Sequence, residues 1–221
     1  MTTERPLRLL MAGMPGAGKG THGRRLAADL GIPHIATGEL LRDAVARRTP
    51  IGIEAQAFMD RGDYVPDEVM VEMIRQRLAD PDAQKGWILD GYPRTQGQAS
   101  ALDKLLADLG LQIDAVLVLE VPFEEMVRRL SGRRTCPTCH RSYHMDDDPP
   151  SDDERCDDDG TPLERRKDDE PETVRYRLKV YAERTAGVVE HYDTDSIVRR
   201  VDGLASVEEV YKRVDEALGL S

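Results

Sequence analysis

The segment Gly13-Met-Pro-Gly-Ala-Gly-Lys-Gly-Thr21 constrains the fold of this chain more than any other part of it. An apolar run typical of a buried strand, Leu7–Ala12, precedes it, and the pattern that follows predicts a helix from Lys19 to about Leu30. Glycines let a backbone fold tightly around an anion, and the helix N-terminus adds partial positive charge. We therefore expect a phosphate-binding loop whose lysine reaches the outer phosphates; the alternative is a Gly-rich turn without a ligand.

Further apolar runs and helical patterns alternate along the chain. Strands are predicted at 87–90 and 115–121, and a weaker one at 197–201. Asp67 is expected to cap a helix that has Met70, Met73, Ile74 and Leu78 on one face, and Ser206 with Glu209 predicts a capping box before Val207, Val210, Tyr211, Val214 and Leu218. The alternation predicts an α/β fold, a P-loop NTPase-type open parallel sheet with flanking helices.

Two segments interrupt this alternation, and we expect both to lie over the carboxyl edge of the sheet, where ligands bind in such folds. Residues 37–66 contain helical stretches without a strand, and residues 132–169 are rich in Cys, Asp, Pro and Arg. The core domain would then comprise residues 1–36, 67–131 and 170–221. The acid-rich run 146–154 is interpreted as a solvated loop.

The bulk composition excludes several classes of protein. With 31 basic and 42 acidic residues the net charge is −11, which argues against a nucleic-acid partner. No apolar stretch approaches the roughly 20 residues that cross a membrane, and the N-terminal residues do not resemble a signal peptide. We expect a cytoplasmic protein with no membrane partner, whose three cysteines are reduced.

The cysteines are spaced for a metal site. Cys136 and Cys139 form one close pair, and Cys156 with Asp159 repeats the same offset on a second turn. Such pairs suit tetrahedral Zn²⁺ in a closed, structural site, and the segment has too few apolar residues for a core of its own. His140 and His144 are competing ligands, and isolated thiols are the alternative.

Three segments carry a resemblance to a known family. The loop has Gly20 between Lys19 and Thr21, and this GxPGxGKGT form resembles the adenylate kinases among the nucleoside monophosphate kinases. Thr37-Gly-Glu-Leu-Leu-Arg42 is similar to the TGDLLR segment of that family, and Asp90-Gly-Tyr-Pro-Arg94 to its DGFPR segment. The resemblance covers nearly the whole chain, and the cysteines match the long-lid members with a zinc-binding lid.

This resemblance implies an activity, which is reversible Mg²⁺-dependent phosphoryl transfer from ATP to AMP that gives two ADP. It also implies that residues 37–66 bind the monophosphate, that residues 132–169 form the lid, and that the protein is a monomer. Phosphoryl transfer requires positioning and positive charge, so we expect no side-chain general base. Asp90, at a strand end, is placed to hold Mg²⁺ through waters.

The resemblance further implies the residues of the site. Contacts to ATP are expected from Gly16, Ala17, Gly18, Lys19, Gly20, Thr21, Arg129, Arg133, Ser142 and Tyr143. Contacts to AMP are expected from Thr37, Gly38, Arg42, Asp63, Tyr64, Val65, Gly91, Tyr92, Pro93, Arg94, Gln98, Arg166 and Arg177. The catalytic set is Lys19, Asp90, Arg94, Arg129, Arg133, Arg166 and Arg177. Asp168 and Asp169 match acids that anchor the closed lid or orient its arginines.

Some features depart from the family or leave alternatives open. His22 stands where the family usually has Gln, and the lid is unusually acidic. The first alternative is a kinase for UMP, CMP or GMP, although Thr37, Gln98 and the long lid favour AMP. A zinc-ribbon nucleic-acid module would need basic residues around the cysteines, and a switch GTPase would need a base-reading motif. The choice between ATP and GTP as donor stays open.

Overall fold

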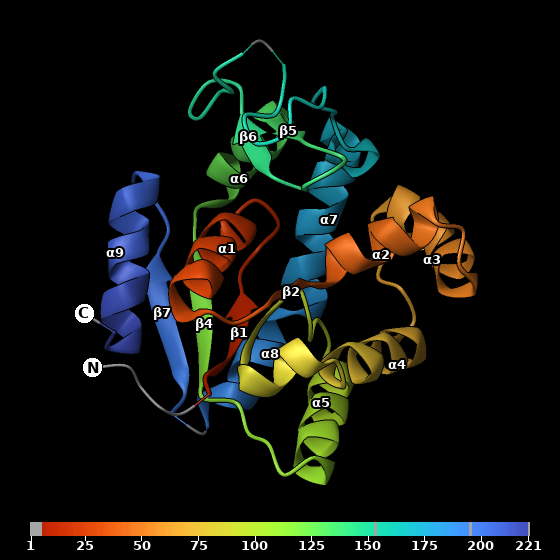
Figure 1. Ribbon diagram of the computed structural model, residues 1–221, viewed down its shortest axis with the longest axis vertical. Coiled ribbons are helices and arrows are strands. Elements are labelled where there is room, and N and C mark those ends of the chain that lie inside the picture. The colour runs from red at the N-terminus through yellow and green to blue at the C-terminus, as the bar shows by residue number, and fades with distance from the viewer. Residues whose placement is uncertain (1–5, 153, 195, 221) are drawn as a thin grey trace.

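A five-stranded parallel sheet forms the centre of the molecule (Figure 1). The computed structural model describes residues 6–152, 154–194 and 196–220. The strand order is β2-β3-β1-β4-β7, and every neighbouring pair is parallel. The strands span Arg8–Ala12 (β1), His34–Ala36 (β2), Trp87–Asp90 (β3), Ala115–Glu120 (β4) and Val198–Asp202 (β7). This confirms the predicted α/β class with an open parallel sheet.

Helices cover both faces of this sheet because alternate strand residues are buried on opposite sides. Leu10 of β1 packs with α4 (Asp67–Leu78), α5 (Gln96–Asp108) and α8 (Ala186–Asp193). Leu9 and Met11 of the same strand point to the other face, against α1 (Lys19–Leu30), α7 (Pro171–Arg184) and α9 (Val207–Leu218). Successive side chains of a strand point to opposite faces of the sheet, and both faces are covered here. The strand residues therefore contribute to two separate cores.

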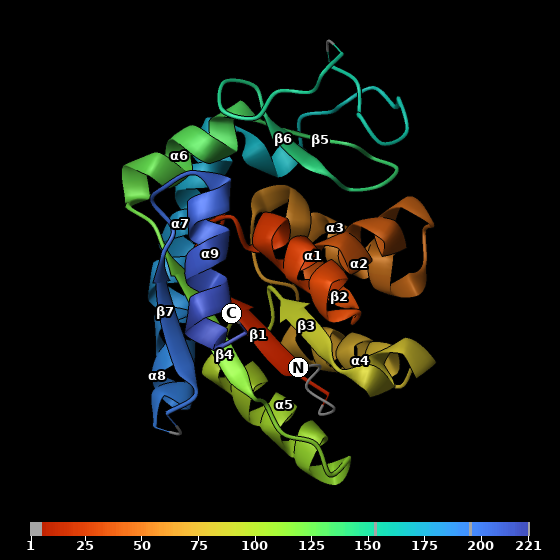
Figure 2. The ribbon, with the colours of Figure 1, turned by 60° about the vertical axis from the view of Figure 1, so that its left-hand side comes forward.

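The two interrupting segments lie beside and above the sheet (Figures 1 and 2). Residues 37–66 form α2 (Thr37–Ala46) and α3 (Pro50–Arg61), which pack on each other without a strand. After α6 (Phe123–Gly132), the segment 132–169 forms a small antiparallel pair, β5 (Arg133–Thr135) with β6 (Ser142–His144). We call the first the helical insertion and the second the cysteine segment. Single 3-10 turns occur at Pro81–Lys85 and Lys167–Asp169.

Most local predictions are confirmed, and three need correction. Asp67 does not cap α4; it is the first helical residue, and its carboxylate accepts hydrogen bonds from Thr95 and Gln98. Strand β2 was not predicted, because three residues are too few to show a period. The capping box at Ser206 and Glu209 is present, but Val207 is 44% exposed and does not belong to the buried face of α9.

No helix among the described residues is both long enough and apolar enough to cross a membrane.

The capping box makes a prediction about stability. Ser206 Oγ accepts the N–H of Glu209 at 3.4 Å, and Glu209 returns a bond to the Ser206 N–H at 3.2 Å. Ser206→Ala should lower the free energy of unfolding by about 0.5–2 kcal/mol, because the Glu209 N–H at the start of the helix loses its acceptor. Urea unfolding measures the change.

Ser131→Ala is the matched control for this substitution. Ser131 Oγ donates back to the Val127 carbonyl at 2.8 Å within α6, an interaction that adds little to a helix. An equal loss of unfolding free energy in Ser206→Ala and Ser131→Ala would contradict a special role for the capping box.

Candidate functional site

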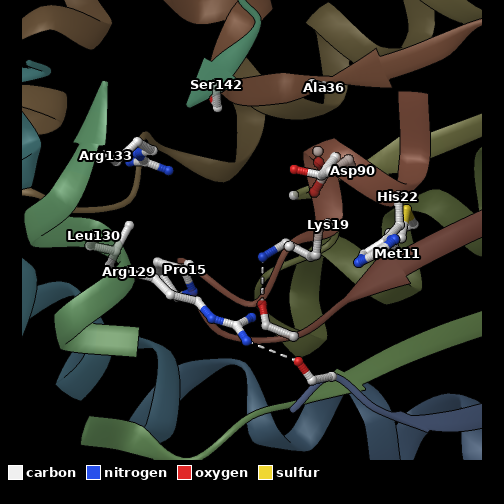
Figure 3. A pocket seen from close by; sticks show the side chains of 18 of the residues that line it. Met11, Pro15, Lys19, His22, Ala36, Asp90, Arg129, Leu130, Arg133 and Ser142 are labelled. Atoms are coloured by element: carbon white, nitrogen blue, oxygen red, sulfur yellow. Dashed lines mark hydrogen bonds between the residues drawn. The ribbon is translucent and has the colours of Figure 1, made fainter. Parts of the chain in front are cut away.

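A cavity of about 1040 Å³ opens at the carboxyl ends of β1 and β3. Its walls come from the phosphate-binding loop, α1, the helical insertion, the residues after β3, α6, α7 and the cysteine segment. Figure 3 shows Lys19, His22, Asp90, Arg129 and Arg133 around this space. Segments far apart in the sequence therefore meet at the edge of the sheet where the sequence placed the site.

The phosphate-binding loop is held in shape by backbone geometry and by its own lysine. Gly13, Gly16 and Gly18 have φ values of 136°, 89° and 94°, which residues with a side chain rarely adopt. A Cβ on Gly13 would lie 2.7 Å from the Leu119 carbonyl oxygen. Lys19 Nζ donates to the carbonyls of Gly13 at 2.7 Å and Met14 at 3.0 Å (Figure 3). The lysine thus lies across the loop with its ammonium in the cavity wall.

The charge of Lys19 is destabilised in this position. Burial lowers its pKa to about 8; the nearby Asp90 carboxylate opposes this shift, and Arg94 adds to it. A phosphate bound in the loop would supply the negative charge that the ammonium requires. The site is therefore arranged to bind anions.

Asp90 ends β3 and is buried beside Lys19. Burial raises its pKa, but the neighbouring His34 ring and Lys19 ammonium outweigh this effect, so that the pKa lies below its usual value. His34 Nε2 lies 3.4 Å from Asp90 Oδ2 and has no hydrogen-bond partner among the described residues. A buried carboxylate that stays ionised at the edge of an anion site is an oxygen ligand of the kind Mg²⁺ prefers, so the residues present fit that ion.

Sequence reasoning did not find His34. It begins β2, the strand that was too short to predict, and the register places Ala36 beside Asp90 on β3. His34 could be predicted at the site only if β2 were known to lie beside β3, the strand that carries Asp90. The order of the strands is needed for that, and the sequence pattern does not supply it.

The predicted acceptor residues divide into two groups. Those that line the cavity are Gly38, Arg42, Tyr64, Gly91, Pro93, Arg94, Arg166 and Arg177. Those that do not are Thr37, Asp63, Val65, Tyr92 and Gln98. The residues of the second group therefore have no surface in the cavity in this structure.

Thr37 and Gln98, two residues of this second group, form hydrogen bonds with residues around the cavity. Thr37 donates to the carbonyls of Asp90 and Gly91 at 3.2 and 3.0 Å. Gln98 Oε1 accepts the Arg94 N–H at 2.7 Å, and its Nε2 donates to Asp67 at 2.7 Å. Both ends of the amide are engaged, so a contact between Gln98 and a base requires an exchange of partners.

Partly buried arginines line much of the rest of the wall. Arg133 makes a two-fold contact with Asp169, at 2.8 Å from Nε and 2.5 Å from the terminal nitrogen. Arg177 pairs with Asp168 at 2.9 Å and Asp169 at 3.2 Å. Burial, followed by the charge of Arg133, lowers the pKa of Arg166 well below its usual value. Crowded, partly desolvated guanidinium groups attract phosphate oxygens strongly.

The donor half of the cavity lies between α6 and α9. Arg129 Nε donates to Glu125 at 2.7 Å, and its terminal nitrogen donates to the Gly203 carbonyl at 3.1 Å (Figure 3). Ser142 and Tyr143 line the cavity from the cysteine segment, and Ala17 is buried beneath the loop without lining it.

His22 is buried in the wall of this donor half. Burial, and then the charge of Arg129, lower its pKa to about 4, so the ring is neutral near pH 7. The ring is nearly parallel to Tyr211 at 6.4 Å between centroids. A neutral imidazole packs there without adding charge to the arginines.

The three cysteines and Asp159 come together as the spacing predicts. One ligand atom from each of Cys136, Cys139, Cys156 and Asp159 lies within 4.8 Å of the others. Three thiolates and one carboxylate fit Zn²⁺ in a closed site. The competing His144 instead accepts the N–H of Asp147 at its Nδ1, at 3.1 Å.

A strand, a phosphate-binding loop and a helix, with clustered arginines facing them, define the class of P-loop phosphotransferases. A model of the adenylate kinase family matches residues 11–197. The chain belongs to the adenylate kinase family, which makes it an enzyme of the nucleoside monophosphate kinase class.

Curated relatives agree over almost the full length. The adenylate kinase of Salinispora tropica is 49% identical and covers 96% of this chain and 98% of its own. That of Carboxydothermus hydrogenoformans is 44% identical over 96% and 99% of the two chains. That of Archaeoglobus fulgidus is 45% identical over 96% and 98%.

The geometry of the cysteine cluster predicts which carboxylate binds metal. Asp159→Ala and Cys156→Ala should lose most of the roughly one Zn²⁺ per chain that four ligands hold, and both should melt at a lower temperature, because bound metal stabilises the folded segment. Metal analysis of the purified variants, with melting curves, measures both effects.

Asp158→Ala is the control, since Asp158 belongs to the same turn but bonds to Arg141 at 2.6 Å and is not one of the four clustered groups. It should keep its metal. Equal metal content in Asp158→Ala and Asp159→Ala would contradict the assignment.

Proposed function

We propose that this enzyme transfers the terminal phosphoryl group of MgATP to AMP, reversibly, giving two ADP. The observation that carries the proposal is the cavity itself, which has the phosphate-binding loop on one side, the helical insertion on the other and partly buried arginines between them. A P-loop protein that only hydrolysed its nucleotide would not need a second set of phosphate ligands.

In the donor half, the backbone N–H groups of Gly16–Thr21 and the ammonium of Lys19 would bind the ATP phosphates. Arg129 offers a planar surface for the donor base, and Ser142 and Tyr143 line the same cavity. Asp90 would hold Mg²⁺ through waters, and that ion would neutralise phosphate charge during transfer. Stacking on Arg129 tolerates adenine and guanine alike.

In the acceptor half, Arg42 and Arg94 would bind the phosphate of AMP. The Arg94 fork is already oriented, because its Nε donates to the Gly91 carbonyl at 2.6 Å and its guanidinium carbon lies 5.2 Å from the centre of the Tyr64 ring. The remaining contacts to AMP are proposed for Thr37, Gly38, Asp63, Tyr64, Val65, Gly91, Tyr92, Pro93 and Gln98, some through neighbours as described above.

The transferred group would lie where Lys19, Arg133, Arg166 and Arg177 converge. These cations would stabilise the oxygens that gain charge in the transition state, and no side chain would need to act as a general base. Asp168 and Asp169 orient Arg133 and Arg177. Catalysis would therefore depend on positioned charge.

Two covers would exclude water from this centre. We propose residues 37–66 as the monophosphate-binding domain, residues 132–169 as a zinc-stabilised lid, and residues 1–36, 67–131 and 170–221 as the core. Closure of both covers would let transfer to AMP outpace hydrolysis. Reduced thiols at the cysteine cluster support a cytoplasmic location. We also propose that the enzyme acts as a monomer, which light scattering tests.

The substrate assignment is tested by a coupled assay with AMP, UMP, CMP and GMP as acceptors. AMP should give the highest kcat/KM. Faster turnover with UMP, CMP or GMP would show that this nucleotide, and not AMP, is the preferred acceptor. The proposal of phosphoryl transfer to a monophosphate would be unaffected.

Removing the loop lysine tests the donor half. Lys19→Met should lower kcat by about 10²-fold or more, because one preorganised cation at the phosphates contributes on the order of 3 kcal/mol to the transition state. The fold should survive, as judged by the melting curve. Lys104→Met, on the exposed face of α5, is the control and should retain full activity. Near-normal turnover of Lys19→Met would refute the role.

The pKa of Lys19 predicts a pH dependence. In the nucleotide-free enzyme the ammonium loses its proton as the pH rises through about 8, so kcat/KM for ATP should fall about tenfold per pH unit above that point. Bound phosphates favour the charged form, so kcat should stay level to a higher pH. Steady-state rates between pH 6.5 and 9.5 measure both. A kcat/KM that stays constant to pH 9.5 would be the contrary result.

A further inference from the structure

One arginine that the proposed mechanism does not use joins three separate parts of the molecule. Arg24 lies in α1, in the core, and its guanidinium reaches the wall of the cavity. One terminal nitrogen donates to the carbonyl oxygen of His140 in the cysteine segment at 2.7 Å. The same nitrogen pairs with the carboxylate of Glu39 in the helical insertion. These partners lie 116 and 15 residues away in the sequence.

The carbonyl that accepts from Arg24 belongs to the turn between the first two metal-binding cysteines and β6. His140 has a φ of 62°, and its N–H donates to the Cys136 carbonyl at 3.1 Å. The Cys136 N–H donates in turn to the Arg141 carbonyl at 2.9 Å. These two hydrogen bonds fix the turn around His140 and therefore the direction of its carbonyl. A bond to that carbonyl thus holds the turn, and with it the cysteine segment, in position.

The other partner lies in the first turn of α2, next to a residue proposed to bind AMP. Glu39 follows Gly38, and a Cβ on Gly38 would lie 3.3 Å from the two terminal nitrogens of Arg42. Residues three apart on a helix share a face, so Glu39 and Arg42 move together with that turn. Where Arg24 holds Glu39, it also sets the position of Arg42 relative to the loop.

We propose that Arg24 is a positioning residue that ties the cysteine segment and the helical insertion to the core helix, and so to each other, around the two nucleotides. The inference rests on the proposed function, since it assigns these segments as the two covers of the site. Arg24 acts through Glu39 and the His140 carbonyl and contacts neither nucleotide.

A tie between the covers has a kinetic signature that a ligand contact lacks. It stabilises the arrangement that holds both nucleotides, so its loss weakens the binding of both by the same factor. It makes no contact to the reacting phosphoryl group, so chemistry in the assembled complex is unaffected. Where opening of the covers limits product release, its loss leaves kcat unchanged or raises it.

The test compares Arg24→Gln with Arg25→Gln. Arg25 is the next residue of α1 and also forms a cross-element ion pair, with Glu208 at 2.7 Å. Within the described residues it forms no hydrogen bond or ion pair with the cysteine segment or the helical insertion. For Arg24→Gln we expect KM for ATP and for AMP to rise together by about 3- to 10-fold, the range of one charge-assisted hydrogen bond, with kcat changed less than twofold. Arg25→Gln should match the wild type.

Hydrogen–deuterium exchange of the nucleotide-free protein supplies a readout that does not depend on activity. Arg24→Gln should speed amide exchange in peptides from both 37–46 and 136–144, whereas Arg25→Gln should not. Glu39→Gln breaks only one contact, so it should speed exchange in 37–46 and leave 136–144 unchanged. The double variant Arg24→Gln/Glu39→Gln should match Arg24→Gln in 37–46, because both changes remove the same pair.

Several results would overturn the tie. A rise in one KM alone would make Arg24 a contact to that nucleotide, and a fall in kcat at constant KM would make it catalytic. Unchanged amide exchange in both segments would show that the contacts of Arg24 do not stabilise either segment. Failure of the proposed function would look different, because the wild type would then phosphorylate no AMP while its exchange pattern remained measurable.

Discussion

The pairing of Arg133 and Arg177 with Asp169 is the interaction on which the arrangement of the site depends. The Asp169 carboxylate is fully buried and accepts from Arg133, at the start of β5, and from Arg177, in α7. A buried carboxylate without partners would be very costly, so these arginines must remain in place. The contact with Arg177 joins the cysteine segment to α7, and both guanidinium groups line the cavity. One buried acid thereby links the position of the cysteine segment to the charge of the site.

The cavity still carries strong positive charge after this pairing. The pKa of Lys19, Arg42, Arg166 and Arg177 is lowered in each case by burial first, with neighbouring arginines adding to the effect. An acidic protein thus concentrates its basic groups in one partly desolvated space. Anionic ligands such as nucleotides would relieve that repulsion, which is the electrostatic reason that the cavity suits them.

Sequence reasoning located the elements well where a local pattern reports them. The helix at Lys19–Leu30 and the strand at Trp87–Asp90 have the bounds predicted, because a glycine-rich loop and a short fully apolar run are strong local signals. The four clustered groups of Cys136, Cys139, Cys156 and Asp159 were found by their spacing, since both pairs lie on turns of the same kind. Strand β2 and the role of Asp67 escaped, because they depend on neighbours that are distant in the sequence.

The sequence by itself determined the class of fold, the phosphate-binding loop and the likeness to adenylate kinases, because short contiguous motifs carry each of them. The tertiary structure decided what those residues touch. It engaged both ends of the Gln98 amide, placed His34 beside Asp90, and brought Arg24 to Glu39 and to the His140 carbonyl. Such contacts depend on the order of the strands and on how two insertions fold back over one edge of the sheet, which no local pattern encodes.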